Sequence, residues 1–141
     1  MTTHDDTPRL FSGLGRVVVL VADQDAALSF YRDVLGFRVL HDRTAADGYR
    51  FLHVGLPGQA GVGLWLMPAA DGPDRALVGR QAGAQPLLVL YAPDLDAVRA
   101  RLHAHGVRTW DEREDGDSRS LHLADLYGNE LVAVQLHEPA G

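Results

Sequence analysis

The chain has 141 residues, of which 46% are hydrophobic, which is enough to bury a core in one domain without disulfides or structural metal. It contains no cysteine, so a disulfide framework, a thiolate metal site and a cysteine nucleophile are excluded. The formal net charge of −6 at pH 7 argues against a nucleic-acid partner, because such partners require a basic face.

The first half of the chain, about residues 14–67, predicts a strand, a helix and three further strands. A β-branched run over residues 16–22 indicates the first strand. Asp23 is a helix-capping residue, and apolar side chains at spacings of three and four predict a helix over residues 24–35 that ends at Gly36. The next three strands are expected at residues 37–42, 49–55 and 62–67.

The same order of elements returns in the second half, after a linker over about residues 68–85 that is rich in Ala, Gly, Asp and Pro. Asp94 precedes an amphipathic helix that Gly106 ends. This second module covers about residues 86–136, with strands expected at residues 87–91, 107–111, 118–125 and 130–136.

The two halves repeat each other in residue type as well as in order. Asp94-Leu-Asp-Ala begins 71 residues after Asp23-Gln-Asp-Ala, and each helix ends at a glycine. Chance similarity between two short helices does not account for the shared order of every element. We therefore predict one α+β domain over residues 1–141, in which two tandem βαβββ modules form a pair of half-barrels around a cavity.

Several motifs carry a family resemblance that covers about residues 14–136. The segment Ser29-Phe-Tyr-Arg-Asp-Val-Leu-Gly-Phe37 resembles the signature of the vicinal oxygen chelate superfamily, which includes glyoxalases, bleomycin-resistance proteins and extradiol dioxygenases. Asp125-Leu-Tyr-Gly-Asn-Glu-Leu131 is similar to the turn and last strand of that superfamily, although Leu126 stands where proline is usual. The resemblance implies the fold but leaves the function open, because the superfamily contains lyases, isomerases, dioxygenases and metal-free drug binders.

The resemblance also implies where a metal would bind in metal-dependent members: one position on the first strand of each module and one on the last. Such a site needs imidazole and carboxylate ligands. In this chain, none of the four matching side chains can ligate a metal, and we therefore expect no metal and no other cofactor. These positions carry Arg16, Trp65, Leu87 and Val132.

Arg16 is the most informative of these replacements, and two interpretations are open. Its guanidinium could replace the positive charge of the ion and pair with a carboxylate, phenolate or phosphate of a ligand. Alternatively, it forms a structural ion pair, for example with Glu130, or points into solvent. Glu130 is two residues before Val132, so its side chain should point the same way and is the best candidate carboxylate.

Strand alternation places further candidates on the cavity side. If Leu52 and Val54 face the core, then Tyr49, Phe51 and His53 face away from it. Trp65 and Met67 are expected to join them and to offer apolar surface for a planar ligand. The alternatives are an ordinary core tryptophan and a histidine whose hydrogen bonds go to the backbone or to water.

Our leading functional hypothesis is a metal-independent binding protein of the bleomycin-resistance type that sequesters or carries a hydrophobic or planar small molecule, with or without an anionic group. The ligand-binding candidates are Arg16, Tyr49, Phe51, His53, Trp65, Met67 and Glu130. The alternative is a glyoxalase-like lyase, isomerase or dioxygenase that uses His53, His122 and Glu130 as acids and bases. A third hypothesis is a regulatory subunit whose cavity has no function.

Two further expectations concern the cellular location and the oligomeric state of the protein. The segment Met1–Arg9 is polar, unlike a signal peptide, and no apolar stretch has the length of a membrane span, so we expect a cytoplasmic protein without a membrane partner. The resemblance implies a homodimer, and the apolar edges of two half-barrels give a physical reason for two chains to pair.

Overall fold

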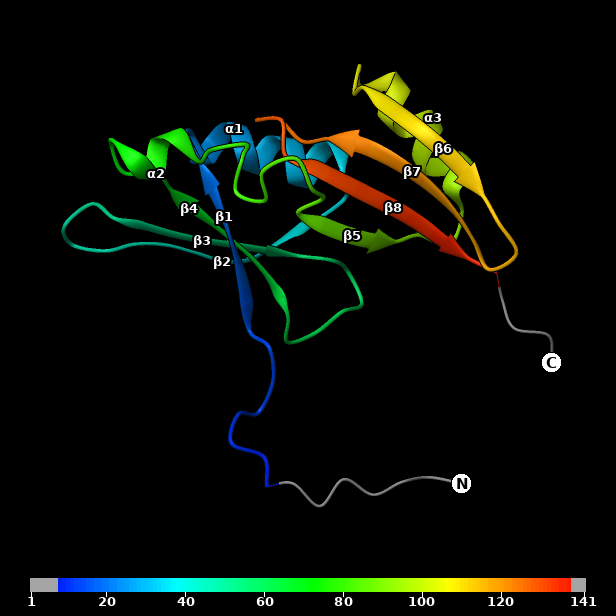
Figure 1. Ribbon diagram of the computed structural model, residues 1–141. Helices are drawn as coiled ribbons and strands as arrows, with labels where there is room; N and C mark the ends of the chain where they lie inside the picture. Colours follow the sequence, from blue (N-terminus) through cyan, green and yellow to red (C-terminus); the bar gives the residue numbers. More distant parts are fainter. Residues whose placement is uncertain (1–7, 138–141) are drawn as a thin grey trace.

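The computed structural model describes residues 8–137, and it confirms the α+β fold of two βαβββ modules (Figure 1). The first module forms a four-stranded sheet, sheet A, in the order β1-β4-β3-β2, in which β1 and β4 are parallel and the other pairs antiparallel. Its elements are β1 (Arg16–Val21), α1 (Gln24–Ser29), η1 (Phe30–Val34), β2 (Arg38–Thr44), β3 (Arg50–Gly55) and β4 (Gly63–Pro68).

The second module forms sheet B in the equivalent order β5-β8-β7-β6, again with one parallel pair, β5 with β8. The connection between the modules contains a short helix, α2 (Pro73–Ala76), which the sequence pattern did not predict. The elements of this module are β5 (Leu88–Tyr91), α3 (Leu95–Ala104), β6 (Thr109–Glu114), β7 (Ser118–Ala124) and β8 (Glu130–Leu136). No helix within residues 8–137 is long and apolar enough to cross a membrane.

The duplication extends to individual polar contacts. Asp23 and Asp94 each accept a hydrogen bond from the backbone N–H three residues later and so cap the first helix of their module. In module one, Arg50 bridges the helix residue Asp25 and the strand residue Asp42. The corresponding residues of module two make the same bridge: Arg119 contacts Asp96 on α3 and Glu112 on β6.

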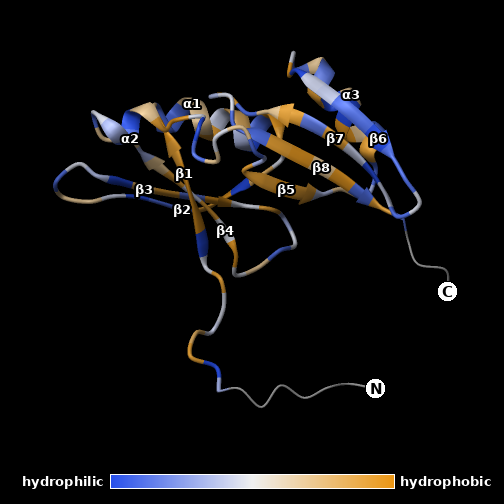
Figure 2. Ribbon diagram, viewed as in Figure 1, coloured by the Kyte–Doolittle hydropathy of each residue, from blue (hydrophilic) through white to orange (hydrophobic). Residues whose placement is uncertain are grey.

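Both modules contribute to one apolar core on the helix-covered sides of their sheets. Strand alternation sends one set of side chains into this core. Figure 2 shows the apolar strands β5 and β8 and, beyond β7 at the edge of the sheet, the more polar strand β6. The fully buried side chains include Val19, Val21, Leu52, Val54, Leu66, Leu95, Leu121 and Leu131.

Polar contacts join the two modules as well. The buried Tyr31 hydroxyl, in η1 of module one, donates to Oδ2 of Asp125 at the end of β7, at 2.7 Å. Asp125 also accepts hydrogen bonds from the backbone N–H groups of Tyr127 and Asn129 and from the Asn129 side chain. Elsewhere, Arg101 of α3 donates to two backbone carbonyls at the end of η1. The Tyr127 hydroxyl of module two also accepts from the N–H of Asp23, the cap of α1, and donates to its carbonyl. The helix of module one is therefore fixed to module two at three points.

Some elements differ from the sequence-based expectation. The helix expected over residues 24–35 changes to π-type hydrogen bonding from Phe30 onward, where the N–H of Leu35 donates to the carbonyl of Phe30. The strand expected at residues 107–111 instead covers Thr109–Glu114. The acidic run over residues 111–117 favours a solvated hairpin loop by sequence, but its first four residues are strand, where Glu112 pairs with arginines of α3 and β7.

We predict that Tyr31→Phe lowers the free energy of unfolding at pH 7 by about 2 kcal/mol, because a buried hydrogen bond to a carboxylate is lost. Burial, with the charge and hydrogen bond of Asp125, raises the pKa of Tyr31 well above its ordinary value of 10.0. Above about pH 10 the unfolded state ionises while the folded state keeps the proton, so wild-type stability falls with rising pH.

Urea unfolding between pH 7 and 11 measures both effects, and the Tyr31→Phe variant should lose less stability than the wild type over this range. Tyr91→Phe is the control, because Tyr91 is 70% exposed and should change stability by only a few tenths of a kcal/mol. Equal stability of Tyr31→Phe and wild type at pH 7 would contradict the prediction.

Candidate functional site

The candidate site is built on the face of sheet A that points away from the helices. Leu52 and Val54 of β3 are fully buried, so Phe51 and His53 lie on the opposite face. Register pairs His53 with Trp65 of β4, and Trp65 with Val18 of β1. The open face therefore brings together the predicted residues Arg16, Phe51, His53, Trp65 and Met67, and none of their side chains is fully buried.

Aromatic rings form a continuous row along this face. Tyr49 contacts Phe51 with 4.8 Å between ring centroids, and Phe51 contacts Trp65 at 5.9 Å. His53 lies 5.1 Å from Trp65 on the other side, and His41 of β2 extends the row at 5.4 Å from His53. Neighbouring rings are tilted by 38° to 64°, so a planar molecule can stack on one ring and contact the edges of its neighbours.

Arg16 reaches this row from β1, although β4 lies between β1 and β3. Its Nε donates to Nδ1 of His53 at 3.1 Å, and its Nη1 donates to the carbonyl of Gly15. The residue beside Arg16 on β4 is Gly63, which has no side chain to block the way. A Cβ at Gly63 would lie 2.5 Å from the carbonyl oxygen of Val54, so no larger residue fits without displacing the backbone.

The contact with Arg16 fixes the tautomer of neutral His53, and burial and nearby charge keep the ring neutral. A guanidinium has no acceptor, so Nδ1 of His53 must accept, and the proton of the neutral ring is on Nε2. Burial lowers the pKa of His53 below its ordinary value of 6.5, and the positive charges of Arg16 and His41 lower it further. His53 is therefore neutral at pH 7 and acts as a hydrogen-bond donor.

Two buried side-chain nitrogens within residues 8–137 have no hydrogen-bond partner, and both belong to this row: Nε2 of His53 and Nε1 of Trp65. A buried donor without an acceptor costs about 1–3 kcal/mol. Such groups are uncommon in folded proteins, and an acceptor supplied by another molecule is one explanation for them.

Module two carries a different polar group at the equivalent place. His122 of β7 pairs in register with Val132 and Trp110, and its Nδ1 lies 2.7 Å from Oε2 of Glu130. The Oδ2 atom of Asp111 lies 3.9 Å from Nε2 of the same ring. His122 therefore lies between two carboxylates, whereas His53 lies beside a guanidinium.

The structure thus divides the predicted site residues between two sheets. The ligand-binding candidates of module one converge on sheet A, with Tyr49 at one end of the row. The carboxylate of Glu130 belongs to sheet B and contacts His122, while Arg16 contacts His53. Two of the acid–base candidates, His122 and Glu130, are therefore brought together, and the third, His53, lies on the other sheet.

The family resemblance implies four metal-ligand positions, and none of the side chains at these positions can bind a metal ion. Arg16 is committed to His53, and Trp65 offers only an N–H donor. Leu87 and Val132 are hydrocarbon side chains without a lone pair. In the described part of the chain, no group of three or more His, Asp or Glu side chains is arranged to hold a metal ion.

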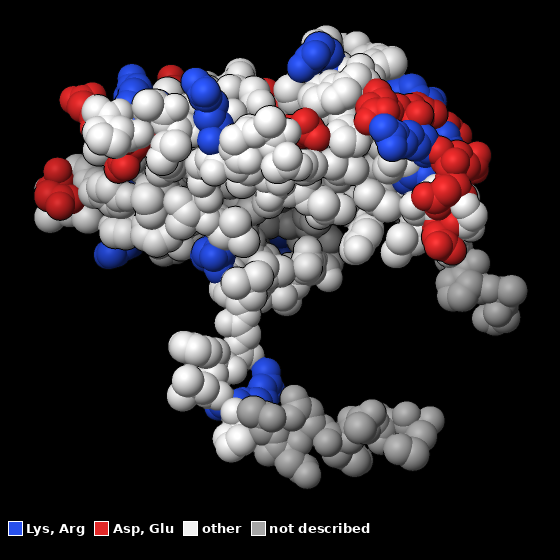
Figure 3. Space-filling model, in the orientation of Figure 1, with Lys and Arg blue, Asp and Glu red and all other residues white. Residues whose placement is uncertain are grey.

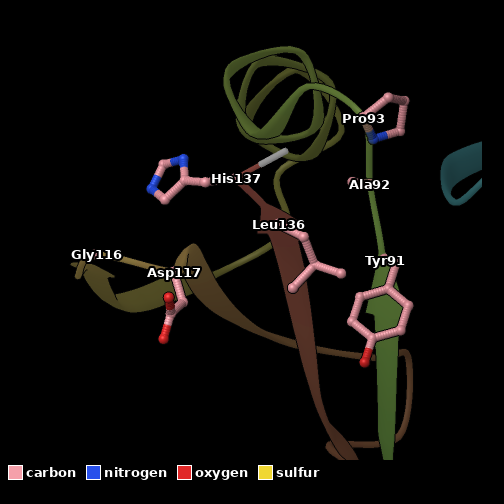
Figure 4. A pocket seen from close by; sticks show the side chains of 7 residues that line it. All are labelled: Tyr91, Ala92, Pro93, Gly116, Asp117, Leu136 and His137. Carbon is pink, nitrogen blue, oxygen red and sulfur yellow. The ribbon is translucent and has the colours of Figure 1, made fainter. Parts of the chain in front are cut away.

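Two hollows lie apart from the open face of sheet A. The first, of about 810 Å³, is open to solvent at one end of sheet B, where Tyr91 and Leu136 lie side by side with Asp117 and His137 beyond Leu136 (Figure 4). The second, of about 170 Å³, is lined by apolar residues of both modules, including Leu35 and Leu90. Neither contains Arg16, His53 or Trp65.

Sequence reasoning missed two contributors to these sites. Asp111, expected at the end of a strand, was given no role in a site, but it lies beside His122 with a left-handed backbone at φ 55°. The alternation of charge over Glu112-Arg113-Glu114 was the available signal that the strand continues. Gln81 hydrogen-bonds the N–H of Leu20 and the carbonyl of Val18, and so covers the outer edge of β1. No sequence pattern pointed to that contact.

Comparison with known proteins agrees with this architecture. A family model described as Glyoxalase/Bleomycin resistance protein/Dioxygenase superfamily matches residues 13–132. The chain belongs to this superfamily, as the sequence motifs predicted. A protein from Shewanella frigidimarina (strain NCIMB 400), described as uncharacterized, is 29% identical over 124 residues, which are 86% of this chain and 92% of that protein.

Solved structures share the fold over nearly the whole chain. TnmS3, described as an antibiotic binding protein from Streptomyces sp. CB03234, is 28% identical with a TM-score of 0.73, covering 92% of this chain and 100% of that one. A superfamily member from Sphaerobacter thermophilus DSM 20745 has a TM-score of 0.72 and 23% identity, covering 90% and 99% of the two chains. The latter similarity concerns the fold alone.

We predict that the pKa of His53 lies below 6.5 and that Arg16→Met raises it, because the nearby positive charge is removed. The measurement is a titration of the histidine ring protons by NMR, with His53 assigned through a His53→Gln variant. Arg43→Met is the matched control: Arg43 lies on the same face over Phe51, and its loss should leave the His53 titration unchanged. An unaltered pKa of His53 in the Arg16→Met variant would contradict the contact between Arg16 and His53.

Proposed function

We propose that this protein binds a hydrophobic, planar small molecule without a metal ion and acts by sequestering or carrying it. The observation that carries the proposal is the row of rings Tyr49, Phe51, Trp65 and His53 on the open face of sheet A, with the Arg16 guanidinium at its end. Stacking on the rings supplies apolar contact, and Arg16 favours a ligand that carries negative charge.

The comparisons support this class of function. TnmS3, which has the same fold, is described as an antibiotic binding protein. By analogy, the ligand of this chain is a compound of antibiotic type. The superfamily also contains enzymes, so fold alone does not favour binding over catalysis. What favours binding here is that the implied metal positions carry side chains without metal-binding atoms.

An enzymatic activity is the second candidate, and one contact favours it. Glu130 orients His122 at 2.7 Å, with Asp111 on the other side of the ring, and a carboxylate–histidine pair of this kind can serve as a general base. A lyase, isomerase or dioxygenase reaction would then take place on sheet B. If the wild-type protein converts a bound compound and the His122→Gln variant does not, an enzymatic activity is favoured over simple binding.

We predict that planar aromatic compounds quench the fluorescence of Trp65 saturably. The chain has two tryptophans, so Trp110→Phe leaves Trp65 as the only indole, and Trp65→Phe is the matched control that leaves Trp110. Titration with 2-acetonaphthone and 2-naphthoate should quench the first variant only. In calorimetry, Trp65→Ala should weaken binding about tenfold, because the stacking surface is lost.

Treatment with a chelator should leave these affinities unchanged, because no metal takes part. Loss of binding after chelation, restored by Ni, Zn, Mn or Fe(II), would contradict metal independence. Equal quenching in the Trp65→Phe and Trp110→Phe variants would mean that the ring row is not the binding site.

We further propose that two copies of the chain form a homodimer. The segment before β1 extends away from the body of the molecule and carries Leu10, Phe11 and Leu14, which are 86%, 79% and 70% exposed (Figure 1). On β5 of sheet B, Val89 and Tyr91 are 57% and 70% exposed. Charged side chains gather over α3 and the β6–β7 hairpin, away from the arm (Figure 3). Pairing would bury these apolar groups.

Sedimentation velocity should give the mass of a dimer for the wild type and of a monomer when Leu10, Phe11 and Leu14 are all changed to Ser. The control changes Leu77 and Leu126 to Ser, because these are exposed apolar residues outside both surfaces. A wild-type monomer at micromolar concentration would exclude the dimer. The cytoplasmic location expected from the sequence stays a prediction.

A further inference from the structure

We propose that His53 and Trp65 form a pair of hydrogen-bond donors that select ligands with an acceptor oxygen, namely a carbonyl, carboxylate or phenolate attached to a planar ring system. This inference rests on the proposed binding function and adds the chemical class of the ligand. It starts from Nε2 of His53 and Nε1 of Trp65, the two buried nitrogens without a partner within residues 8–137.

Both nitrogens are donors. The indole Nε1 carries a proton and has no acceptor capacity. For His53, the Nε of Arg16 already donates to Nδ1, so in the neutral ring the proton is on Nε2. Burial and the charges of Arg16 and His41 lower the pKa of His53, which keeps the ring neutral in this tautomer. The row therefore presents two N–H groups that require an oxygen acceptor.

The two donors are close enough to act on one ligand. His53 and Trp65 are register partners on β3 and β4, their ring centroids are 5.1 Å apart, and both side chains lie on the open face of sheet A. The rings of Phe51 and Tyr49 continue the row beyond Trp65. Because both nitrogens are buried between the rings, an oxygen substituent of a stacked ligand would reach them after a rotation of the His53 and Trp65 side chains.

The charges on this face favour the same class of ligand. Arg16 contacts His53 in the row, and Arg43 lies over Phe51 at 5.9 Å from the ring centroid. The carboxylate of Asp42 belongs to the other side of the sheet, in register with buried Leu52, and is bound there by Arg50. A partly or fully negative oxygen is thus stabilised here, and a cationic ligand is disfavoured.

Three probes of similar shape separate this proposal from stacking alone. 2-Acetonaphthone carries a ketone oxygen, 2-naphthoate carries a carboxylate, and 2-isopropenylnaphthalene has a CH₂ group in place of the ketone oxygen. By calorimetry, the ketone and the carboxylate should bind the wild-type protein about 10- to 100-fold more tightly than the alkene, because only they satisfy both donors.

Variants that keep an aromatic ring but lose the N–H donor test whether His53 and Trp65 cause the preference for ketone over alkene. His53→Phe and Trp65→Phe should each reduce the preference for ketone over alkene severalfold while changing alkene affinity less. Trp110→Phe is the matched control, because Trp110 is an indole on sheet B, outside the ring row. It should retain the wild-type preference.

A second readout does not depend on the folding of variants at these positions. In proton–nitrogen correlation spectra, the ketone should shift the Trp65 indole N–H downfield, whereas the alkene should not, and the Trp110 signal should not move with either. Equal affinity for ketone and alkene would overturn the donor pair and leave the proposed binding function intact. Failure of all three probes to bind would overturn both proposals.

Discussion

The buried carboxylate of Asp125 is the interaction on which the arrangement of the two modules depends. A carboxylate inside a protein must be compensated by hydrogen bonds, and this one accepts four: two from backbone N–H groups of its own turn, one from Asn129 and one from Tyr31. The fourth donor belongs to the other module. The buried carboxylate therefore has its full set of donors only when η1 of module one is packed against module two.

The duplication explains which residues maintain the fold and which are free to differ. Both modules keep the aspartate cap of the helix and the bridge from a strand arginine to a helix aspartate. On the open faces the modules differ: His53 is bound by an arginine, and His122 by a glutamate. One scaffold thus carries a face of hydrogen-bond donors and a face of acceptors.

Much of this was predictable from the sequence. Strand alternation placed Phe51 and His53 opposite Leu52 and Val54, and the repeated capping residues and glycines predicted both modules. The partner of Arg16 could not be predicted, because it depends on strand order: Arg16 crosses β4 at Gly63 to reach β3. A contact between strands that are not neighbours in the sheet leaves no periodic signal. The strand character of the acidic run was missed for a related reason, since it depends on arginines distant in the sequence.

Alternation along each strand has a consequence for how such proteins diverge. The arginine bridges and the apolar core occupy the helix side of each sheet, while the ring row and the histidine pairs occupy the other side. Most substitutions on the open side, apart from the one glycine over which Arg16 passes, leave the apolar core and the arginine bridges in place. The chemistry of the open side can therefore change by single substitutions while the residues that build the fold stay the same.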